Sequence, residues 1–381
     1  MRAPAFWFTR PDRPALAARL LAPAAALWSL GGRWRAWRAR PAHPGVPLIC
    51  VGNLTAGGAG KTPAVRLVLE RLAARGIAAH VLLRGHGGRI AGPHRVDPQD
   101  SGGADGAADV GDEALLHAAL APTWVARDRA AGAAAAATAG AAAVVMDDGY
   151  QNPHVRPDLR LLAVDAEQGF GNGRLIPAGP LREAVGHGLA RADLVLLVGL
   201  PAARARCRAL WPALGAAPTL EVEIRPLPTG LALEGLPVVA FAGIGRPGKF
   251  FDTLERMGAR VLARIPFPDH AAYAPAVLER LSRHARGLNA MLVTTEKDAV
   301  RLPAAFRRGV TVLPVAMVAE DPGPLDAVLD RLLAGAAGHA AGHAAGHAAG
   351  HRAGHMTGHR AGHGAGHGAG SIAGAGRGPG A

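Results

Sequence analysis

VPLICVGNLTAGGAGKTPAVRLVLERLAARG (residues 46–76) joins an apolar run to a glycine-rich loop and then to a helical pattern. In the last part, apolar residues recur at the spacing of one helix face, and Gly76 can end the helix. Small residues between a strand and a helix let successive backbone N–H groups converge on an anion at the helix N-terminus. The stretch therefore predicts a phosphate-binding loop within an α/β fold.

The loop departs at one position from the usual pattern G-x-x-x-x-G-K-[ST]. Lys61, Thr62 and Gly60 fill their places, but Thr55 stands where the first glycine is expected. In this pattern the lysine reaches the β- and γ-phosphates, and the hydroxyl holds Mg²⁺. An ordinary glycine turn would require the lysine, the threonine and the strand–loop–helix context to coincide by chance. We therefore expect these residues to bind the nucleotide: Thr55, Ala56, Gly57, Gly58, Ala59, Gly60, Lys61 and Thr62.

The composition favours a cytosolic protein with anionic partners. The 381 residues suffice for a large α/β core with two lobes, and two cysteines exclude a disulfide framework. The formal net charge is +13, yet only three of the 42 basic residues are lysines: Lys61, Lys249 and Lys297. An ammonium and a guanidinium are not equivalent at a tight site, so these three lysines are functional candidates unless they survive by chance.

Residues 1–45 combine arginine and tryptophan with an apolar stretch that Arg19 and Pro23 interrupt. The stretch is shorter than the ~20 apolar residues that a spanning helix needs, and no signal peptide is evident. We expect a helix in the membrane interface, attracted to anionic lipid. A helix packed on its own domain is the alternative. Nucleic acid is not expected, since its binding favours basic and aromatic residues spread along a groove.

Apolar runs separated by helical stretches predict a mostly parallel sheet covered on both faces. We expect a phosphate-loop domain at residues 46–235, a smaller α/β lobe at 236–334 and a disordered, histidine-rich tail at 335–381. The runs expected as strands are residues 46–51, 78–83, 142–148, 159–165, 194–199, 238–243 and 291–295.

Two pairs of acids are candidates for chemistry. Asp147 and Asp148 end an apolar run, where an acid can hold Mg²⁺ opposite the loop hydroxyl or simply form a turn. Asp112 and Glu113 begin a helical pattern, where Asp112 is either an N-cap or a base near the transferred phosphate.

Two further segments supply cations. His270 precedes another helical pattern and is a base, an orienting partner or a solvent-exposed side chain. Residues 171–185 form a glycine- and proline-rich stretch that is either a lid over the phosphate site or a surface connection. Arg182 within it suits a clamp on anionic oxygens.

Eight motifs in order over residues 5–330 resemble the tetraacyldisaccharide 4'-kinase (lipid A 4'-kinase) family. Its phosphate loop typically reads G-N-x-x-x-G-G-x-G-K-T-P, so Thr55 is no defect, and Gly57 would supply the close backbone approach. The motifs are VGNLTAGGAGKTP (51–63), RGHGG (84–88), GDE (111–113), DDGYQ (147–151), GNGRLIPAGPLRE (171–183), AGIGRPGKFF (242–251), FPDHAAY (267–273) and TTEKDAVRL (294–302).

The resemblance implies that γ-phosphoryl transfer from ATP to the 4'-hydroxyl of a tetraacyldisaccharide 1-phosphate gives lipid IVA in lipid A biosynthesis. It implies that Asp112 accepts the hydroxyl proton, that His270 orients Asp112, and that Arg182 contacts a phosphate. It also implies a peripheral or monotopic enzyme at the cytoplasmic face of the bacterial inner membrane, with no protein partner predicted. The Mg²⁺ ligands that we expect are Thr62, Asp147, Asp148 and Glu113.

The chain departs from the family at His86, where a tyrosine is common, and after Gln151, where a histidine is more frequent.

The tail repeats a tetrapeptide that contains Gly-His. Its imidazoles suggest adventitious metal affinity and would gain positive charge near pH 6. A GTPase that acts as a metal chaperone is the competing class. It lacks support, because the chain has no N-K-x-D guanine-reading motif and no cysteine cluster.

Overall fold

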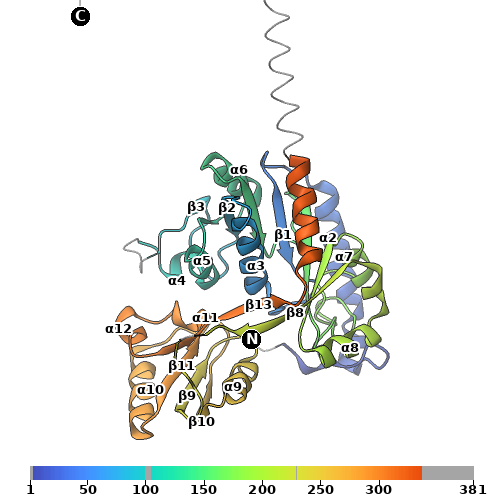
Figure 1. The fold of residues 1–381 in the computed structure, drawn as a ribbon. Helices are drawn as coiled ribbons and strands as arrows, with labels where there is room; N and C mark the ends of the chain where they lie inside the picture. The colour runs from blue at the N-terminus through green and yellow to red at the C-terminus, as the bar shows by residue number, and fades with distance from the viewer. Residues whose placement is uncertain (1–2, 99–103, 229, 337–381) are drawn as a thin grey trace, which may run out of the picture. The chain divides into compact units, whose positions relative to one another are not determined.

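The seven apolar runs form buried strands of two separate sheets (Figure 1). The computed structural model describes residues 3–98, 104–228 and 230–336, so the histidine-rich tail lies almost entirely outside the described residues. Both sheets belong to one compact unit, residues 1–334.

The larger sheet has nine strands in the order β13-β8-β7-β6-β1-β5-β2-β4-β3. Neighbouring strands are parallel except at two places, where β13 pairs with β8 and β3 with β4. The strands are β1 (Leu48–Gly52), β2 (Ala79–Leu83), β3 (His94–Arg95), β4 (Thr123–Val125), β5 (Ala143–Asp147), β6 (Leu159–Asp165), β7 (Leu194–Val198), β8 (Thr219–Pro226) and β13 (Val315–Ala319).

Helices cover both faces of this sheet because its strands are apolar on both sides. In β1, Ile49 and Val51 pack in one apolar cluster, and Leu48 and Cys50 pack in the other. The first face carries α3 (Lys61–Ala73), α4 (Ala107–Val110), α5 (Asp112–Ala118) and a helix over residues 323–336. The second carries α6 (Arg129–Thr138), α7 (Val185–Leu189), α8 (Pro201–Leu210) and η3 (Pro212–Ala216).

The smaller sheet has four parallel strands in the order β10-β9-β11-β12. Residues of α9 pack on one face and residues of α10 on the other. The elements are β9 (Pro237–Ala242), α9 (Pro247–Arg256), β10 (Arg260–Pro266), α10 (Pro275–Gly287), β11 (Met291–Thr295), α11 (Glu296–Ala299), α12 (Ala304–Arg307) and β12 (Thr311–Leu313). The predicted α/β class, with a mostly parallel main sheet and a smaller lobe, is confirmed.

The smaller lobe is an insertion in the larger domain. Its last strand is β12, and the chain then returns to the large sheet, where Val315 of β13 lies opposite Pro226 of β8. The helix over residues 323–336 follows, and its Asp326 pairs with Arg71 of α3 and with Arg75 just after α3. Residues 315–334 therefore pack on the phosphate-loop domain, although they fall within the range 236–334 that the sequence assigns to the smaller lobe.

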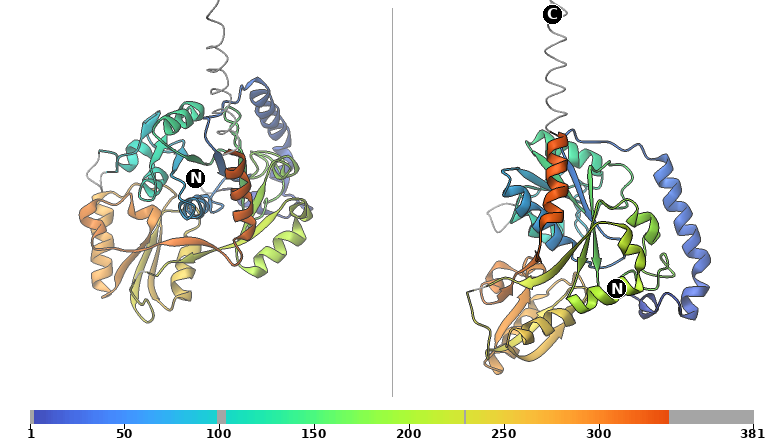
Figure 2. Two further views of the ribbon diagram at one scale, coloured as in Figure 1. Left: turned by 45° about the horizontal axis from the view of Figure 1, so that its top comes forward. Right: turned by 45° about the vertical axis from the view of Figure 1, so that its right-hand side comes forward.

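The N-terminal segment lies on the outside of the larger domain (Figure 2). It contains η1 (Ala5–Phe8), α1 (Leu16–Leu20) and α2 (Ala22–Arg38), and Pro23 lies in the first turn of α2. Trp7 and Trp28 donate indole N–H bonds of 3.0 Å and 3.2 Å to the carbonyls of Pro177 and Arg182.

Large apolar side chains of this segment face outward. Leu20 is 72% exposed and Trp37 is 82% exposed. Within the described part of the chain, no helix combines the length and the hydrophobicity that crossing a bilayer requires.

Candidate functional site

The phosphate loop leaves the carboxyl end of β1, in the middle of the large sheet. Its conformation depends on buried Asn53, whose amide donates to the carbonyls of Thr55 and Gly57 at 2.8 Å and 3.2 Å. Gly57 and Gly60 have φ angles of +119° and +82°, which favour glycine. A Cβ at Gly57 would meet no atom within 4 Å, so the backbone there faces open space.

Lys61 is the first residue of α3, with Gly60 as its N-cap. The free N–H groups of the first turn and the helix dipole make this end of α3 a site for anions. Thr62 is partly buried in the same turn.

Residues 171–183 are built into the phosphate loop and are not a loose lid above it. The N–H of Ala56 donates to Pro180 at 2.7 Å, and the N–H of Arg182 donates to Leu54 at 2.8 Å. Buried Asn172 donates to Ala178 at 2.9 Å inside the same stretch. These hydrogen bonds fix the backbone of Arg182 against that of the phosphate loop.

Asp148 lies between the two cations of the phosphate site. Its carboxylate accepts a 2.7 Å hydrogen bond from Arg182 and lies 3.6 Å from the ammonium of Lys61. Burial acts to raise the pKa of Asp148, but Lys61 and Arg182 lower it below its ordinary value. The φ angle of Asp148 is +52°, a conformation that costs energy for a residue with a side chain. Such strain is often found at functional positions.

Asp147 points to a different partner, which the sequence does not reveal. Its Oδ2 accepts a 2.9 Å hydrogen bond from Nε2 of His117 on α5, and both side chains are buried. Its Oδ1 is buried and has no hydrogen-bond partner among the described residues. His117 thus fixes one carboxylate oxygen and leaves the other free for a cation.

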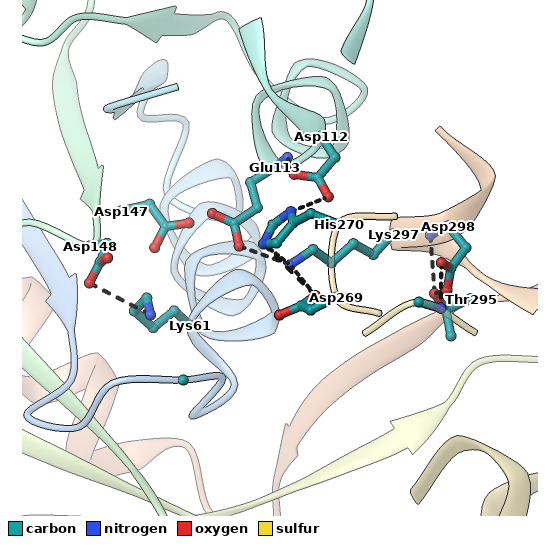
Figure 3. A network of polar contacts seen from close by, with 12 residues as sticks. Lys61, Asp112, Glu113, Asp147, Asp148, Asp269, His270, Thr295, Lys297 and Asp298 are labelled. Carbon is teal, nitrogen blue, oxygen red and sulfur yellow. Dashed lines mark hydrogen bonds and ion pairs between the residues drawn. The ribbon is translucent and has the colours of Figure 1, made fainter. Parts of the chain in front are cut away.

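Asp112 and His270 meet across the boundary between the two lobes (Figure 3). Nδ1 of His270 lies 3.0 Å from Oδ2 of Asp112, which is the first residue of α5 and is buried. Gly111 before it has a φ angle of +88°, and a Cβ there would lie 2.6 Å from the carbonyl of His86. Neither an N-cap for Asp112 nor a purely solvent-facing His270 matches these contacts.

The two groups shift one another's pKa in opposite directions. Burial acts to raise the pKa of Asp112, but the hydrogen bond from His270 and the charges of Lys297 and Arg301 lower it. That same hydrogen bond raises the pKa of His270, against its partial burial and the charge of Lys297. Asp112 is therefore held as a carboxylate.

Lys297 joins the lobes beside this pair. Its ammonium lies 3.5 Å from Glu113, 3.7 Å from Asp269 and 3.4 Å from Nε2 of His270 (Figure 3). Glu113, expected as a metal ligand, is thus paired with a cation. No group of three or more His, Cys, Asp or Glu side chains that could hold a metal ion occurs within the described ranges.

Comparisons with known proteins show which family this chain resembles. Residues 17–334 match the family described as Tetraacyldisaccharide-1-P 4'-kinase. The chain is 55% identical over 338 residues to the tetraacyldisaccharide 4'-kinase of Dinoroseobacter shibae, covering 88% of this chain and 99% of that protein. It is 54% identical over 340 residues to the protein of the same name from Rhodospirillum centenum, and the match covers 88% of this chain and 98% of that protein.

A solved structure shares the fold. It is the crystal structure of the "apo" form of LpxK from Aquifex aeolicus in complex with ATP, with a TM-score of 0.67 and 24% sequence identity. The match covers 83% of this chain and 99% of that one.

Proposed function

The chain belongs to the tetraacyldisaccharide 4'-kinase family, and we propose how its two lobes divide that phosphoryl transfer. The larger domain binds the nucleotide, and the contact between Asp112 and His270 activates the acceptor. This contact carries the proposal, because it places a buried carboxylate and an orienting histidine from two lobes within hydrogen-bond distance, 3.0 Å.

The donor is ATP, as in the complex of the Aquifex protein. The first turn of α3 and Lys61 bind the β- and γ-phosphates. Arg182, now on Asp148, is within reach of a phosphate that enters the loop, so phosphate oxygens replace the carboxylate as its partner. Positioning and charge neutralisation of this kind dominate phosphoryl transfer.

The residues present also fit Mg²⁺. A threonine hydroxyl and a carboxylate oxygen are ligands that Mg²⁺ prefers, and the buried Oδ1 of Asp147 has no protein partner among the described residues. Thr62 and Asp147 would hold the ion, with Asp148 beside them, while Glu113 serves Lys297 instead. Bound Mg²⁺ would neutralise charge that develops on the β- and γ-phosphate oxygens.

The acceptor half of the reaction centres on Asp112. Its carboxylate takes the proton of the 4'-hydroxyl as that oxygen forms its bond to the γ-phosphorus. The bond from the γ-phosphorus to the bridging oxygen breaks, and ADP leaves. His270 holds Oδ2 of Asp112, and Oδ1, which accepts a 3.0 Å hydrogen bond from the N–H of Glu113, is the oxygen that meets the substrate.

The lipid substrate explains the N-terminal segment. We place α1 and α2 in the interface of the cytoplasmic leaflet of the inner membrane, because their leucines and tryptophans are exposed and their arginines attract anionic headgroups. The hydrogen bonds from Trp7 to Pro177 and from Trp28 of α2 to Arg182 then connect the N-terminal segment to the phosphate site.

Transfer of labelled γ-phosphate from ATP to tetraacyldisaccharide 1-phosphate in detergent micelles tests the proposal. Asp112→Asn should lower kcat by at least ~10²-fold, the usual size of a general-base effect, and leave ATP affinity unchanged. Asp252→Asn, at an exposed position of α9, is the matched control and should retain wild-type activity. Full activity of Asp112→Asn would remove Asp112 as the base.

A further inference from the structure

Arg301 has a side chain that is only 7% exposed and lies 3.7 Å from Asp112, beside the Asp112–His270 contact. It follows α11 in the smaller lobe. Its Nη1 donates to the carbonyl of Ala271 at 3.1 Å, and its Nη2 donates to the carbonyl of Gly243 at 2.9 Å. One guanidinium thus ties together the segment after β9 and the segment that carries His270.

The segment that carries His270 needs such support. His270 has a φ angle of +57°, and its own N–H bond to Gly243 is long, at 3.3 Å. A side chain in this backbone conformation persists only where its surroundings impose it. Arg301 binds the carbonyl of the next residue, Ala271, and the same Gly243 carbonyl that accepts from the N–H of His270, so it supports the strained position from two sides.

Asp298 fixes Arg301 in turn. The carboxylate is fully buried, and its Oδ1 accepts hydrogen bonds from Nη2 of Arg301 at 2.7 Å and from the hydroxyl of Tyr273 at 2.6 Å. The N–H of Gly243 donates to the same oxygen at 2.8 Å. A buried charge needs this degree of hydrogen bonding, and the geometry of Arg301 is consequently well defined.

Arg301 also reaches the other lobe. Its Nε lies 3.7 Å from Oδ2 of Asp112, the oxygen that accepts from His270. The guanidinium charge therefore faces the carboxylate that we propose as the base, while its Nη atoms hold the loop of the orienting histidine. One side chain acts on both members of the pair.

We propose that Arg301, held by Asp298, is a positioning residue that sets the Asp112–His270 geometry on which phosphoryl transfer depends. The inference rests on the proposed role of Asp112 as base. Arg301 does not touch the nucleotide loop in any described contact, so its effect falls on turnover and not on ATP binding.

The test compares Arg301→Lys and Arg301→Met with wild type in the lipid phosphorylation assay, with kcat, both KM values, ATP affinity and thermal unfolding measured. Misplacement by about 1 Å costs ~10²-fold, so the methionine variant should lose at least ~30-fold in kcat with KM for ATP within about twofold. Lysine keeps the charge but cannot reach both carbonyls, so the kcat of the lysine variant should lie between those of wild type and the methionine variant.

Two controls separate positioning from stability. Leu281→Ala removes apolar contacts in the core of the smaller lobe but no hydrogen bond to Arg301 or Asp298, so it should lower the unfolding temperature and keep kcat within about threefold. Arg283→Met, at an exposed site on α10, should change neither.

A kcat for Arg301→Met within threefold of wild type would overturn the inference, as would equal losses in the lysine and methionine variants. If the methionine variant does not fold, the lysine variant decides, and wild-type kcat there overturns the inference. Asp112→Asn in the same assay separates the two proposals. If Asp112→Asn keeps full activity, the proposed role of Asp112 as base is wrong. If Asp112→Asn loses activity while the Arg301 variants keep theirs, only the proposed role of Arg301 is wrong.

Discussion

Asp112 and His270 stabilise one another's charge, and this makes the stability of the protein depend on pH. Asp112 has a lowered pKa, so its contribution is present above the unfolded value of ~3.9 and is lost as pH falls through its folded pKa. His270 has a raised pKa, so its contribution is present below ~6.5 and is lost as pH rises through its folded pKa. The pair therefore contributes most to the stability of the folded protein between about pH 3.9 and about pH 6.5.

We predict that His270→Gln lowers the free energy of unfolding more at about pH 5 than at about pH 8.5. The groups that face His270 are Asp112, Asp269, Lys297 and His86, and the hydrogen bond to Asp112 outweighs the charge of Lys297. Urea unfolding of wild type and variant at both pH values measures the difference. A difference that is equal or larger at the higher pH would contradict the prediction.

The control for this measurement is His284→Gln, at an exposed position of α10. The side chain of His284 makes no hydrogen bond or ion pair among the described contacts, so this variant measures the general effect of replacing a histidine by glutamine.

Sequence motifs predict most of the individual residues of the site, but they do not predict which of these residues contact one another. Lys61, Asp148 and Arg182 come from three motifs, and only the fold shows that Asp148 holds both cations. His117 carries no sequence signal, because its partner Asp147 is 30 positions away and on another element.

Scarce lysines are a partial guide to the site. Lys61 and Lys297 lie at the site, whereas Lys249 pairs with Glu167 and Asp165 at a second contact between the lobes.

At the scale of elements, strands that are buried along their whole length are predictable from the sequence, and strands that are partly exposed are not. β1, β5 and β7 are continuous apolar runs because both faces are covered. In β10 (RVLARIP) exposed and half-buried residues alternate, and in β8 (TLEVEIRP) only the leucine and the valine are buried. Their strand character depends on neighbours that a single sequence does not show.

The N-terminal helices give a prediction at this scale. The combined change Leu16→Ser, Leu20→Ser and Leu27→Ser should weaken binding to vesicles that contain phosphatidylglycerol by at least ~10-fold. Each leucine contributes up to ~1.5–3 kcal/mol when its apolar surface leaves water. All three side chains are exposed in the structure. Co-sedimentation with vesicles at fixed ionic strength measures the effect.

A matched set of leucines controls for general changes in surface polarity. Leu200, Leu210 and Leu288 are also exposed but lie outside the N-terminal segment. Their combined replacement by serine should leave vesicle binding unchanged. Equal weakening by both sets would show that α1 and α2 are not the membrane surface.

At the scale of the whole molecule, the smaller lobe is inserted at one point of the large sheet. β8 ends at Pro226 and β13 begins at Val315, directly opposite, and the N–H of Leu227 donates to Pro314 at 2.9 Å. The chain enters and leaves the smaller lobe through this antiparallel pair. The large sheet, the phosphate loop and the helix over residues 323–336 are complete without the inserted residues.

We therefore predict that the larger domain folds without residues 228–313 when Asn-Gly joins Leu227 to Pro314, since this dipeptide favours a two-residue hairpin turn. The shortened protein should unfold cooperatively and bind ATP, because its phosphate loop is intact. Lipid phosphorylation should fall by at least ~10²-fold, because His270 is removed with the lobe. Calorimetry, ATP titration and the transfer assay measure these three properties.

Full-length Asp112→Asn is the comparison for this deletion, because it removes the base and keeps both lobes. The two proteins should bind ATP with similar affinity and share the loss of lipid phosphorylation, since each lacks one half of the Asp112–His270 pair. If the shortened protein does not fold, the inserted lobe is required for the large sheet, and the division of folding between the lobes is wrong. If it folds and still phosphorylates the lipid, the smaller lobe contributes nothing to the transfer, and His270 loses its assigned role.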